Sequence, residues 1–381
     1  MAYLDNNATT QPAPEVFEAM APFLKENFGN PSSSHAVGRA ARNVIEDARA
    51  AVAELLGASE PSEIVFTSGG TESDNWALIG AAAVSQGRSG IVTTAVEHEA
   101  VRNACDYLEQ MGCRVTTVGV DGLGRLDKDS LRQALTKETA VVSVMMANNE
   151  TGVVFPVTEI ARIVREHSDA LVHVDGVAAV GKLPISLRET EIDLFSVSAH
   201  KFHGPKGVGA LYIRSGVELP PRTFGGRQES GRRAGTEAVH QIAGIGAAAR
   251  LVQDIGAMDR VAKLRDRLES EVLRLVPGSS VNGDRSDAAR IPNTTNISFS
   301  LVNGEMLLSR LDDEGISVST GSACNSESRE ISAVLRAMDL PFERAAASIR
   351  FSLGRYNTAE EIDRVLGLLP GIVEELRSIS V

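Results

Sequence analysis

Seven short apolar runs recur along the first two thirds of the chain, separated mostly by stretches with helical spacing. The runs cover residues 64–66, 91–93, 114–118, 141–146, 171–174, 194–197 and 208–213. Continuous apolar runs of this length are typical of strands buried on both faces, and stretches such as 157–167 have the period of covering helices. The pattern predicts an α/β fold with a mainly parallel seven-stranded sheet between helices, which binds ligands at the carboxyl ends of its strands.

The pattern changes after about Gly256. A charged stretch with helical spacing covers 258–276, and residues 296–299 and 348–352 alternate between apolar and polar. Alternation is typical of a sheet with one solvated face. We therefore predict a large domain over 15–256 and a smaller α+β domain over 1–14 and 257–381, which carries Cys324.

The composition narrows the class of protein. The chain has 381 residues, of which 43% are hydrophobic and 23% charged, an ordinary balance for a globular protein. A net charge of −12 argues against a surface that binds nucleic acid or an anionic membrane. Residues 1–10 lack the pattern of a secretory signal, and no apolar run approaches the length of a membrane span. The three cysteines form no CxxC pair, which disfavours structural zinc, so we expect no metal and a cytoplasmic location.

Two residues at predicted strand ends suggest a cofactor. Lys201 lies in a polar, glycine-bearing segment (198–207) after one apolar run, and Asp175 ends an earlier run. Pyridoxal 5'-phosphate (PLP) requires an amine to hold its aldehyde and a carboxylate to keep its ring nitrogen protonated. Lys201 and Asp175 are candidates for these groups, although either residue alone fits an ordinary surface lysine or strand-end aspartate.

The segment 67–75 follows a predicted strand and precedes a helical stretch. Gly70 and Thr71, with the hydroxyl of Ser198, could hold a phosphate at the start of that helix. An ordinary strand–helix turn with an N-cap fits these residues equally well. The segment matches neither GxGxxG nor a P-loop, which disfavours a nucleotide site.

His98 and Asn149 also follow predicted strands. The imidazole of His98 could stack on a flat ring or move protons, although a lone histidine in such a loop is more often structural. The amides of Asn148 and Asn149 could orient a carboxylate or simply form a turn.

Arg350 and Cys324 are the candidates in the C-terminal third. Arg350 interrupts an apolar strand pattern and could bind a substrate carboxylate or form an internal salt bridge. Cys324 lies in a small, polar segment (317–326), where an exposed thiol could attack a bound substrate. With an ordinary pKa near 8.5 only about 3% of such a thiol is ionised at pH 7, so it needs activation. Most lone cysteines are packed and inert, as we expect for Cys105 and Cys113, which flank a helical stretch.

Several long motifs occur in order along nearly the whole chain. They cover residues 3–10, 29–33, 67–75, 97–98, 148–152, 198–207, 233–236, 321–324 and 350–355. Through them the chain closely resembles the class V PLP-dependent enzymes, specifically the cysteine desulfurases of the NifS/IscS type. The resemblance implies the fold type I of PLP-dependent transferases and a homodimer that removes sulfur from L-cysteine.

The resemblance also implies roles for the residues around the cofactor. Lys201 would hold PLP and later move the substrate α-proton, Asp175 would pair with the ring nitrogen, and His98 would stack on the ring and assist proton transfer. The phosphate would be surrounded by Gly70, Thr71, Ser198 and His200. Thr236 would reach the phosphate of the neighbouring subunit.

The implied substrate site adds three residues. Asn149 and Arg350 would orient the carboxylate of cysteine. Cys324 would attack the substrate sulfur, giving L-alanine and an enzyme persulfide for a sulfur-acceptor protein, such as an iron–sulfur scaffold or a thiolation enzyme.

Ala178 departs from the family pattern. Relatives have a glutamine there that donates a hydrogen bond to the phenolic oxygen of the cofactor, and here the segment is Val174-Asp175-Gly176-Val177-Ala178. The loss would raise the pKa of the Schiff base with Lys201 and lower turnover, unless another group or a water compensates. Arg227, where relatives often have a glycine, is a second departure in a loop expected to face the dimer partner.

Two alternatives remain open at this point. The enzyme could catalyse another class V reaction, such as transamination or selenocysteine cleavage. Replacing Cys324 decides between the two, because it should abolish desulfuration of cysteine and leave a transaminase unaffected. A weakly active scaffold that binds sulfur acceptors is favoured only by Ala178.

Overall fold

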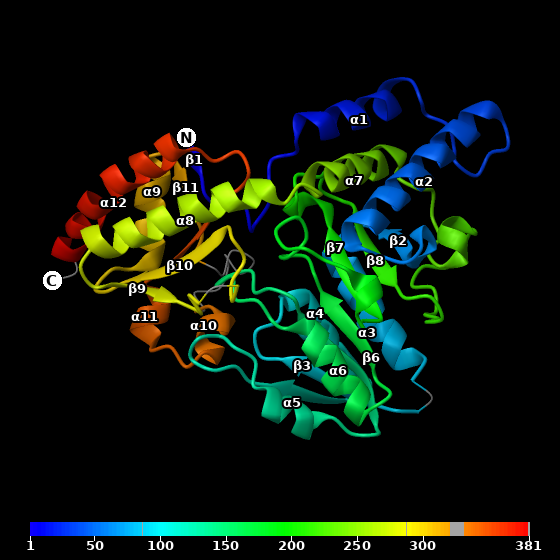
Figure 1. The fold of residues 1–381 in the computed structure, drawn as a ribbon, viewed down its shortest axis with the longest axis horizontal. Helices are drawn as coiled ribbons and strands as arrows, with labels where there is room; N and C mark the ends of the chain where they lie inside the picture. Colours follow the sequence, from blue (N-terminus) through cyan, green and yellow to red (C-terminus); the bar gives the residue numbers. More distant parts are fainter. Residues whose placement is uncertain (86, 287, 321–330, 380–381) are drawn as a thin grey trace.

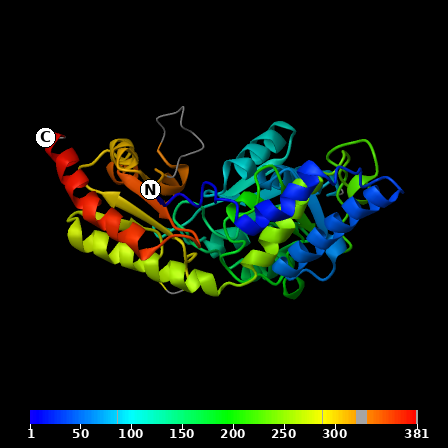
Figure 2. The ribbon, with the colours of Figure 1, turned by 90° about the horizontal axis from the view of Figure 1, so that it is seen from above.

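The computed structural model describes residues 1–85, 87–286, 288–320 and 331–379. Figures 1 and 2 show an elongated molecule with two lobes. The larger lobe is built on a seven-stranded sheet, and the smaller lobe contains a three-stranded sheet and the N-terminal strand.

The large sheet confirms the predicted α/β architecture. Its strand order is β2 (Ile64–Thr67), β8 (Gly209–Ile213), β7 (Leu194–Ser198), β6 (Leu171–Asp175), β5 (Thr139–Met145), β3 (Gly90–Thr94) and β4 (Arg114–Val118). β8 is antiparallel to both of its neighbours, and the other pairs are parallel. Every strand corresponds to one of the seven apolar runs.

Helices cover both faces of this sheet, as Figure 1 shows. One face packs against α3 (Gly70–Ala83) and α4 (Glu99–Gln110) through a cluster that includes Trp76 and Leu108. The other face packs against α2 (Ala36–Leu56), α6 (Val157–His167) and α7 (Val239–Val252), and α1 (Pro14–Lys25) lies on α7. The remaining elements of this lobe are α5 (Lys128–Ala134), η1 (Pro61–Glu63), η2 (Leu187–Glu189), η3 (Ala199–Lys201) and η4 (Gln228–Gly231).

The smaller lobe has a core of its own that includes Leu4, Leu268 and Phe351. Its sheet places β10 (Thr294–Phe299) between β9 (Ser279–Asn282) and β12 (Ser348–Ser352), and β1 (Ala2–Tyr3) pairs with β11 (Ile316–Ser317). Its helices are α8 (Gly256–Leu275), α9 (Gly304–Asp313) and α12 (Ala359–Ile379). Two short helices, α10 (Ala333–Ala337) and α11 (Phe342–Ala346), contribute side chains to the core of the large lobe. The division of the chain at 14 and 256 stays a prediction.

The expectation of a solvated face on the small sheet is wrong. β10 and β12 are buried along their whole length. Their polar face packs against the loop after β5, where Asn296 Nδ2 donates to Glu150 O (3.4 Å) and Arg350 Nη1 donates to Asn149 O (3.1 Å). Polar side chains can alternate in a buried strand when such contacts satisfy them. This face therefore forms part of the contact between the lobes.

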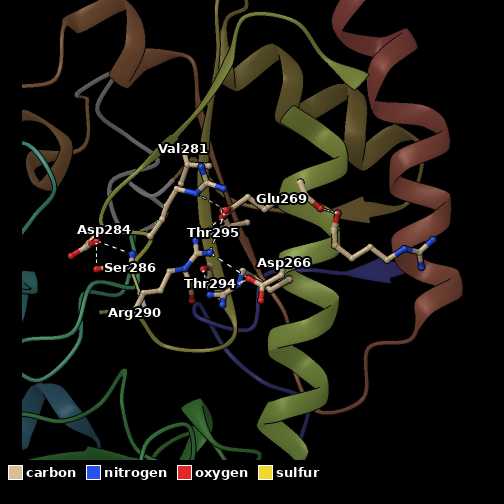
Figure 3. Close-up of polar contacts among 12 residues, drawn as sticks. Asp266, Glu269, Val281, Asp284, Ser286, Arg290, Thr294 and Thr295 are labelled. Atoms are coloured by element: carbon tan, nitrogen blue, oxygen red, sulfur yellow. Dashed lines mark hydrogen bonds and ion pairs between the residues drawn. The ribbon is translucent and has the colours of Figure 1, made fainter. Parts of the chain in front are cut away.

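The connection between β9 and β10 fastens the two lobes to each other. Figure 3 shows Glu269 of α8 at the centre of this connection, where it accepts hydrogen bonds from Arg290 Nη1 (2.5 Å) and Thr295 Oγ1 (2.7 Å). On the same connection Asp284 pairs with Arg125 Nε of the large lobe (2.5 Å), which holds the pKa of the Asp284 carboxyl well below its usual range. The same connection is hydrogen-bonded to the loop after β5, where Val154 N donates to Ala289 O and Ile291 N donates to Gly152 O (both 2.8 Å), so it joins the small sheet to that loop.

Candidate active site

A cavity of about 550 Å³ opens at the carboxyl ends of the parallel strands, between the two lobes. Its walls contain nine of the predicted site residues: Gly70, Thr71, His98, Asn149, Asp175, Ser198, His200, Lys201 and Arg350. Thr236 is exposed and does not line the cavity, and Cys324 lies outside the described residues. The structure thus brings together predicted residues from six separate segments of the sequence at the place where the fold binds ligands.

Lys201 ends η3, the short helix that follows β7. Its Nζ donates to Asn7 O (2.6 Å) and to Ala8 O (2.9 Å) of the N-terminal segment. These carbonyls hold the amine at the cavity wall. Because η3 follows directly on the buried strand β7, the sheet fixes the start of the short helix that Lys201 ends.

Asp175 is the last residue of β6 and is 6% exposed. Its Oδ1 accepts a hydrogen bond from Val177 N (2.9 Å). Burial raises the pKa of this carboxyl, and the nearby His98 and Lys201 oppose the rise. A buried carboxylate at a cavity wall favours a cationic partner, such as a protonated ring nitrogen.

Two further buried acids lie near Asp175. Burial raises the pKa of Glu97 to about 8, and burial together with Asp175 raises that of Asp74 well above its ordinary value. Burial also lowers the pKa of His173 to about 3, and its ring is hydrogen-bonded to Ser143 and Ser196. Burial disfavours the charged form of all three carboxyls, and Asp175 is the one whose pKa is lowered again by the nearby His98 and Lys201.

The start of α3 supplies the candidate phosphate site. α3 begins at Gly70, and its first N–H groups lie at the cavity wall beside Ser198. Gly69 has a φ of +153°, and a Cβ at Gly209 would lie 2.7 Å from Gly69 Cα, so both glycines are needed for the close approach of β8 to this turn. His200, whose pKa burial and Lys201 lower to about 4, adds a neutral donor. A helix N-terminus with such donors favours an anion.

Arg233 fastens the segment that contains Thr236 to this turn. Its Nε pairs with Glu72 Oε1 in the first turn of α3 (2.6 Å). Thr236, three residues later, is exposed and is not among the residues that line this chain's cavity. Its predicted contact with the phosphate of a neighbouring subunit stays a prediction.

His98 is the N-cap of α4. Its Nδ1 accepts a hydrogen bond from Ala100 N (3.1 Å). Burial lowers the pKa of His98, Asp175 raises it, and Lys201 lowers it further. A ring that accepts at Nδ1 carries its proton on Nε2. His98 therefore presents a neutral imidazole to the cavity, where the flat ring could stack on a planar ligand.

Arg350 makes the internal salt bridge and also lines the cavity. Its Nη2 pairs with Asp5 Oδ1 (2.7 Å), its Nη1 donates to Asn149 O, and its Nε makes no hydrogen bond within the described residues. A 2% exposed guanidinium with a donor left over is suited to a carboxylate ligand. The neighbouring amide of Asn148 instead forms the turn, since its Oδ1 accepts from Glu150 N and Thr151 N.

The cysteines differ in environment. Cys105 lies inside α4 rather than beside it, and burial raises the pKa of its thiol to about 12, so it is inert. Cys113 is half-buried. Ser319, five residues before Cys324, pairs with Arg350 through both backbone groups (Ser319 N to Arg350 O, 3.2 Å). Ser319 thus lies beside Arg350 of the cavity wall, and Cys324 itself lies outside the described residues.

Among the residues that sequence reasoning missed at the cavity are the N-terminal Asn7 and Ala8, and Lys182. Asn7 and Ala8 lie in the first motif, but nothing in their residue types indicates that their carbonyls accept from Lys201. Lys182 also lines the cavity, and its signal was present: a lysine within the otherwise apolar segment 178–183.

Comparisons with known proteins agree with this geometry. The aminotransferase class-V family matches residues 2–365. The chain belongs to this family. A cysteine desulfurase of Cereibacter sphaeroides is 53% identical over 379 residues, which cover 99% of this chain and 97% of that protein. A solved NifS-like protein superposes with a TM-score of 0.92 at 40% identity, covering 98% of this chain and 100% of that one. The solved structure of SspA in complex with cysteine has a TM-score of 0.83 at 33% identity, covering 94% of this chain and 100% of that one.

These likenesses place the chain among the NifS/IscS-type cysteine desulfurases of the class-V family, and they confirm the predicted fold. Cysteine desulfurases of the family use PLP. The residues present fit that cofactor, because an amine, a buried carboxylate, a neutral imidazole and a helix N-terminus surround one cavity. No helix in the described ranges is long and apolar enough to cross a bilayer.

Proposed function

We propose that this chain removes sulfur from L-cysteine with PLP, leaving L-alanine and a persulfide on Cys324. The observation that carries the proposal is the convergence of Lys201, Asp175 and Arg350 on one cavity. The first two fit the cofactor, and the third fits the carboxylate of an amino-acid substrate. The buried guanidinium of Arg350, with an N–H group that makes no hydrogen bond within the described residues, favours substrates that carry a carboxylate over those that do not.

PLP, when bound, supplies the electron sink that weakens bonds at the substrate α-carbon. Asp175 would pair with the ring nitrogen of the cofactor and favour its protonated form, and the start of α3 would hold the phosphate. Lys201 carries the α-proton, since its Nζ is held at the cavity wall by Asn7 O and Ala8 O. His98 presents its Nε2 proton to the cavity, and Arg350 with Asn149 fixes the orientation of the substrate.

The Cys324 thiolate completes the proposed reaction. It attacks the sulfur of the bound cysteine, so that an S–S bond forms and the electron pair of the C–S bond returns to the three-carbon skeleton, which takes up a proton to give alanine. Ser319 is anchored beside Arg350, and five residues of chain span at most about 18 Å. The thiol is therefore tethered within reach of the substrate site.

We also propose a homodimer, a sulfur-acceptor protein as partner and a cytoplasmic location. Two features support the dimer: Thr236 is exposed on a segment anchored at the phosphate site, and Phe224 nearby is 86% exposed. A persulfide carrier needs a reduced thiol, which favours a reducing compartment. Light scattering of the purified protein tests the dimer, and Thr236→Ala should weaken PLP binding.

The test of the function is the absorbance spectrum of the purified protein before and after cysteine is added. We expect a yellow band that cysteine changes, release of sulfide in the presence of a thiol reductant, and a borohydride-reduced adduct that maps to Lys201. Colourless protein without an adduct after incubation with PLP would contradict the proposal. Desulfuration that survives Cys324→Ala would favour another class V reaction, and cofactor binding without sulfide release would favour a scaffold.

A further inference from the structure

Lys182 is a buried lysine without a carboxylate partner. It lies in the turn after β6, is 7% exposed, and lines the same cavity as Ala178 and Lys201. Its Nζ donates to Ala178 O (2.9 Å), and no acidic side chain of the described residues forms an ion pair with it. Burial, with a contribution from Lys201, lowers its pKa to about 7. A buried ammonium is costly unless an anion compensates it, so this site is suited to an anionic ligand atom.

The order of the strands shows which atom of PLP would face Lys182. Lys201 and Asp175 fix opposite ends of the ring, because the aldehyde carbon lies para to the ring nitrogen. The two remaining positions beside the aldehyde carry the phosphate arm on one side and the phenolic oxygen on the other. The phosphate site comes from β2 and β7, so the phenolic oxygen points the other way, towards the loops after β6 and β5. Ala178 and Lys182 belong to the loop after β6.

Ala178 leaves this part of the wall without a side-chain donor. A methyl group offers no hydrogen bond, and the amide-bearing residue of the next loop, Asn149, belongs to the predicted carboxylate site. Lys182 follows Ala178 by one helical turn, and its ammonium retains two N–H groups after donating to Ala178 O. The ammonium of Lys182 is therefore positioned to donate a hydrogen bond to an oxygen that lies next to Ala178.

We propose that Lys182 provides the cationic hydrogen-bond donor to the phenolic oxygen of the cofactor, in place of the donor that Ala178 lacks. The inference depends on the proposed binding of PLP. It makes Lys182 a positioning and charge-tuning residue, and it means that the loss of glutamine at 178 is compensated within this chain.

The other charges around Lys182 define the expected effect. Lys201, His200, Lys206 and Arg350 line the cavity as cationic or basic groups, and Asp175, Asp74 and Glu72 line it as acids. The phenolate of the bound cofactor would lie next to Lys182, and the ammonium would stabilise the phenolic oxygen in its deprotonated, negatively charged form. Removing the ammonium should therefore raise the pKa of the bound cofactor, read from the pH dependence of its visible absorbance, by about 1 unit or more.

The test compares Lys182→Met with Lys206→Met, which removes the same charge from an exposed position of the same cavity. Absorbance of the reconstituted proteins is titrated with pH, and PLP affinity is measured by reconstitution of the apo-proteins. We expect Lys182→Met to raise the absorbance pKa and weaken PLP binding about tenfold, and Lys206→Met to change the absorbance pKa little. Adding Ala178→Gln should restore the pKa in the Lys182→Met background and change it little in the wild type.

The outcomes separate this inference from the proposed function. No coloured complex in the wild type would overturn the function itself. A coloured complex whose absorbance pKa is the same in Lys182→Met as in Lys206→Met would overturn only the role of Lys182. If the role of Lys182 were purely structural, Lys182→Met would instead lower the melting temperature of the apo-protein and leave the absorbance pKa unchanged. We expect the apo Lys182→Met protein to melt at or above the wild type, since methionine fills the space without a buried charge.

Discussion

His98 combines a structural and a chemical role, and a matched pair of variants separates them. Its Nδ1 caps α4 by accepting from Ala100 N, while its ring lines the cavity. His98→Asn retains an N-cap acceptor and removes the imidazole. His98→Ala removes both.

The two roles predict two different magnitudes. Loss of an N-cap acceptor costs about 1 kcal/mol of stability, and asparagine is among the best N-cap residues, so His98→Ala should be less stable than His98→Asn by about 1 kcal/mol. Loss of a general acid–base group typically lowers kcat by about 10²- to 10⁴-fold. Both variants should therefore lose activity equally, although only one loses the cap.

Urea unfolding of the apo-proteins measures the first quantity, because bound cofactor would add its own stabilisation. Sulfide release at saturating cysteine measures the second. Equal stability of the two variants would show that the Ala100 contact contributes nothing. An active His98→Asn protein would show that the imidazole takes no part in the reaction.

Three further predictions concern the substrate, the thiol and pH. Arg350→Lys keeps the charge but loses the fork, so the KM for cysteine should rise about tenfold or more while the cofactor spectrum is unchanged, as steady-state kinetics would show. Cys324→Ser should abolish persulfide formation, detected by alkylation and mass spectrometry, and leave the spectral response to cysteine intact. The folded pKa of Glu97 is raised to about 8, so the folded protein holds a proton that the unfolded chain loses above its ordinary pKa of 4.5. Its contribution to stability is present below pH 4.5 and lost as pH rises towards 8, by at most about 1.4 kcal/mol per pH unit. Glu97→Gln should make the urea midpoint of unfolding depend less on pH over that range. A pH dependence parallel to that of the wild type would contradict the raised pKa of Glu97.

The large sheet could be predicted from sequence because its strands are buried on both faces. A strand such as β5 has no solvated side, so the apolar run itself marks the element, and residues at its carboxyl end mark the site. The small sheet could not be predicted in the same way. Alternation in β12 shows that one face is polar, but only tertiary packing shows that the loop after β5, rather than water, covers that face.

Residue types also left the roles of neighbouring side chains undecided. Asn148 and Asn149 are chemically identical, and the fold alone makes the first a turn residue and the second a wall residue. For Arg350 the two alternatives, salt bridge and ligand site, proved compatible, because Asp5 occupies one nitrogen of the fork and leaves another unpartnered. A sequence pattern cannot count the donors that remain after internal pairing.

The N-terminal segment explains why the site needs both lobes. β1 pairs with β11 in the small lobe, so the chain must pass the cavity before it reaches α1 on the large lobe. Along this passage Asp5 pairs with Arg350, and Asn7 Nδ2 donates to Asn149 O (3.0 Å) while Asn7 O accepts from Lys201. One short segment therefore contacts the amine of Lys201, predicted to hold the cofactor, and both predicted carboxylate ligands. Any movement of the small lobe that shifts this segment changes the binding of cofactor and substrate together, since the same backbone positions both.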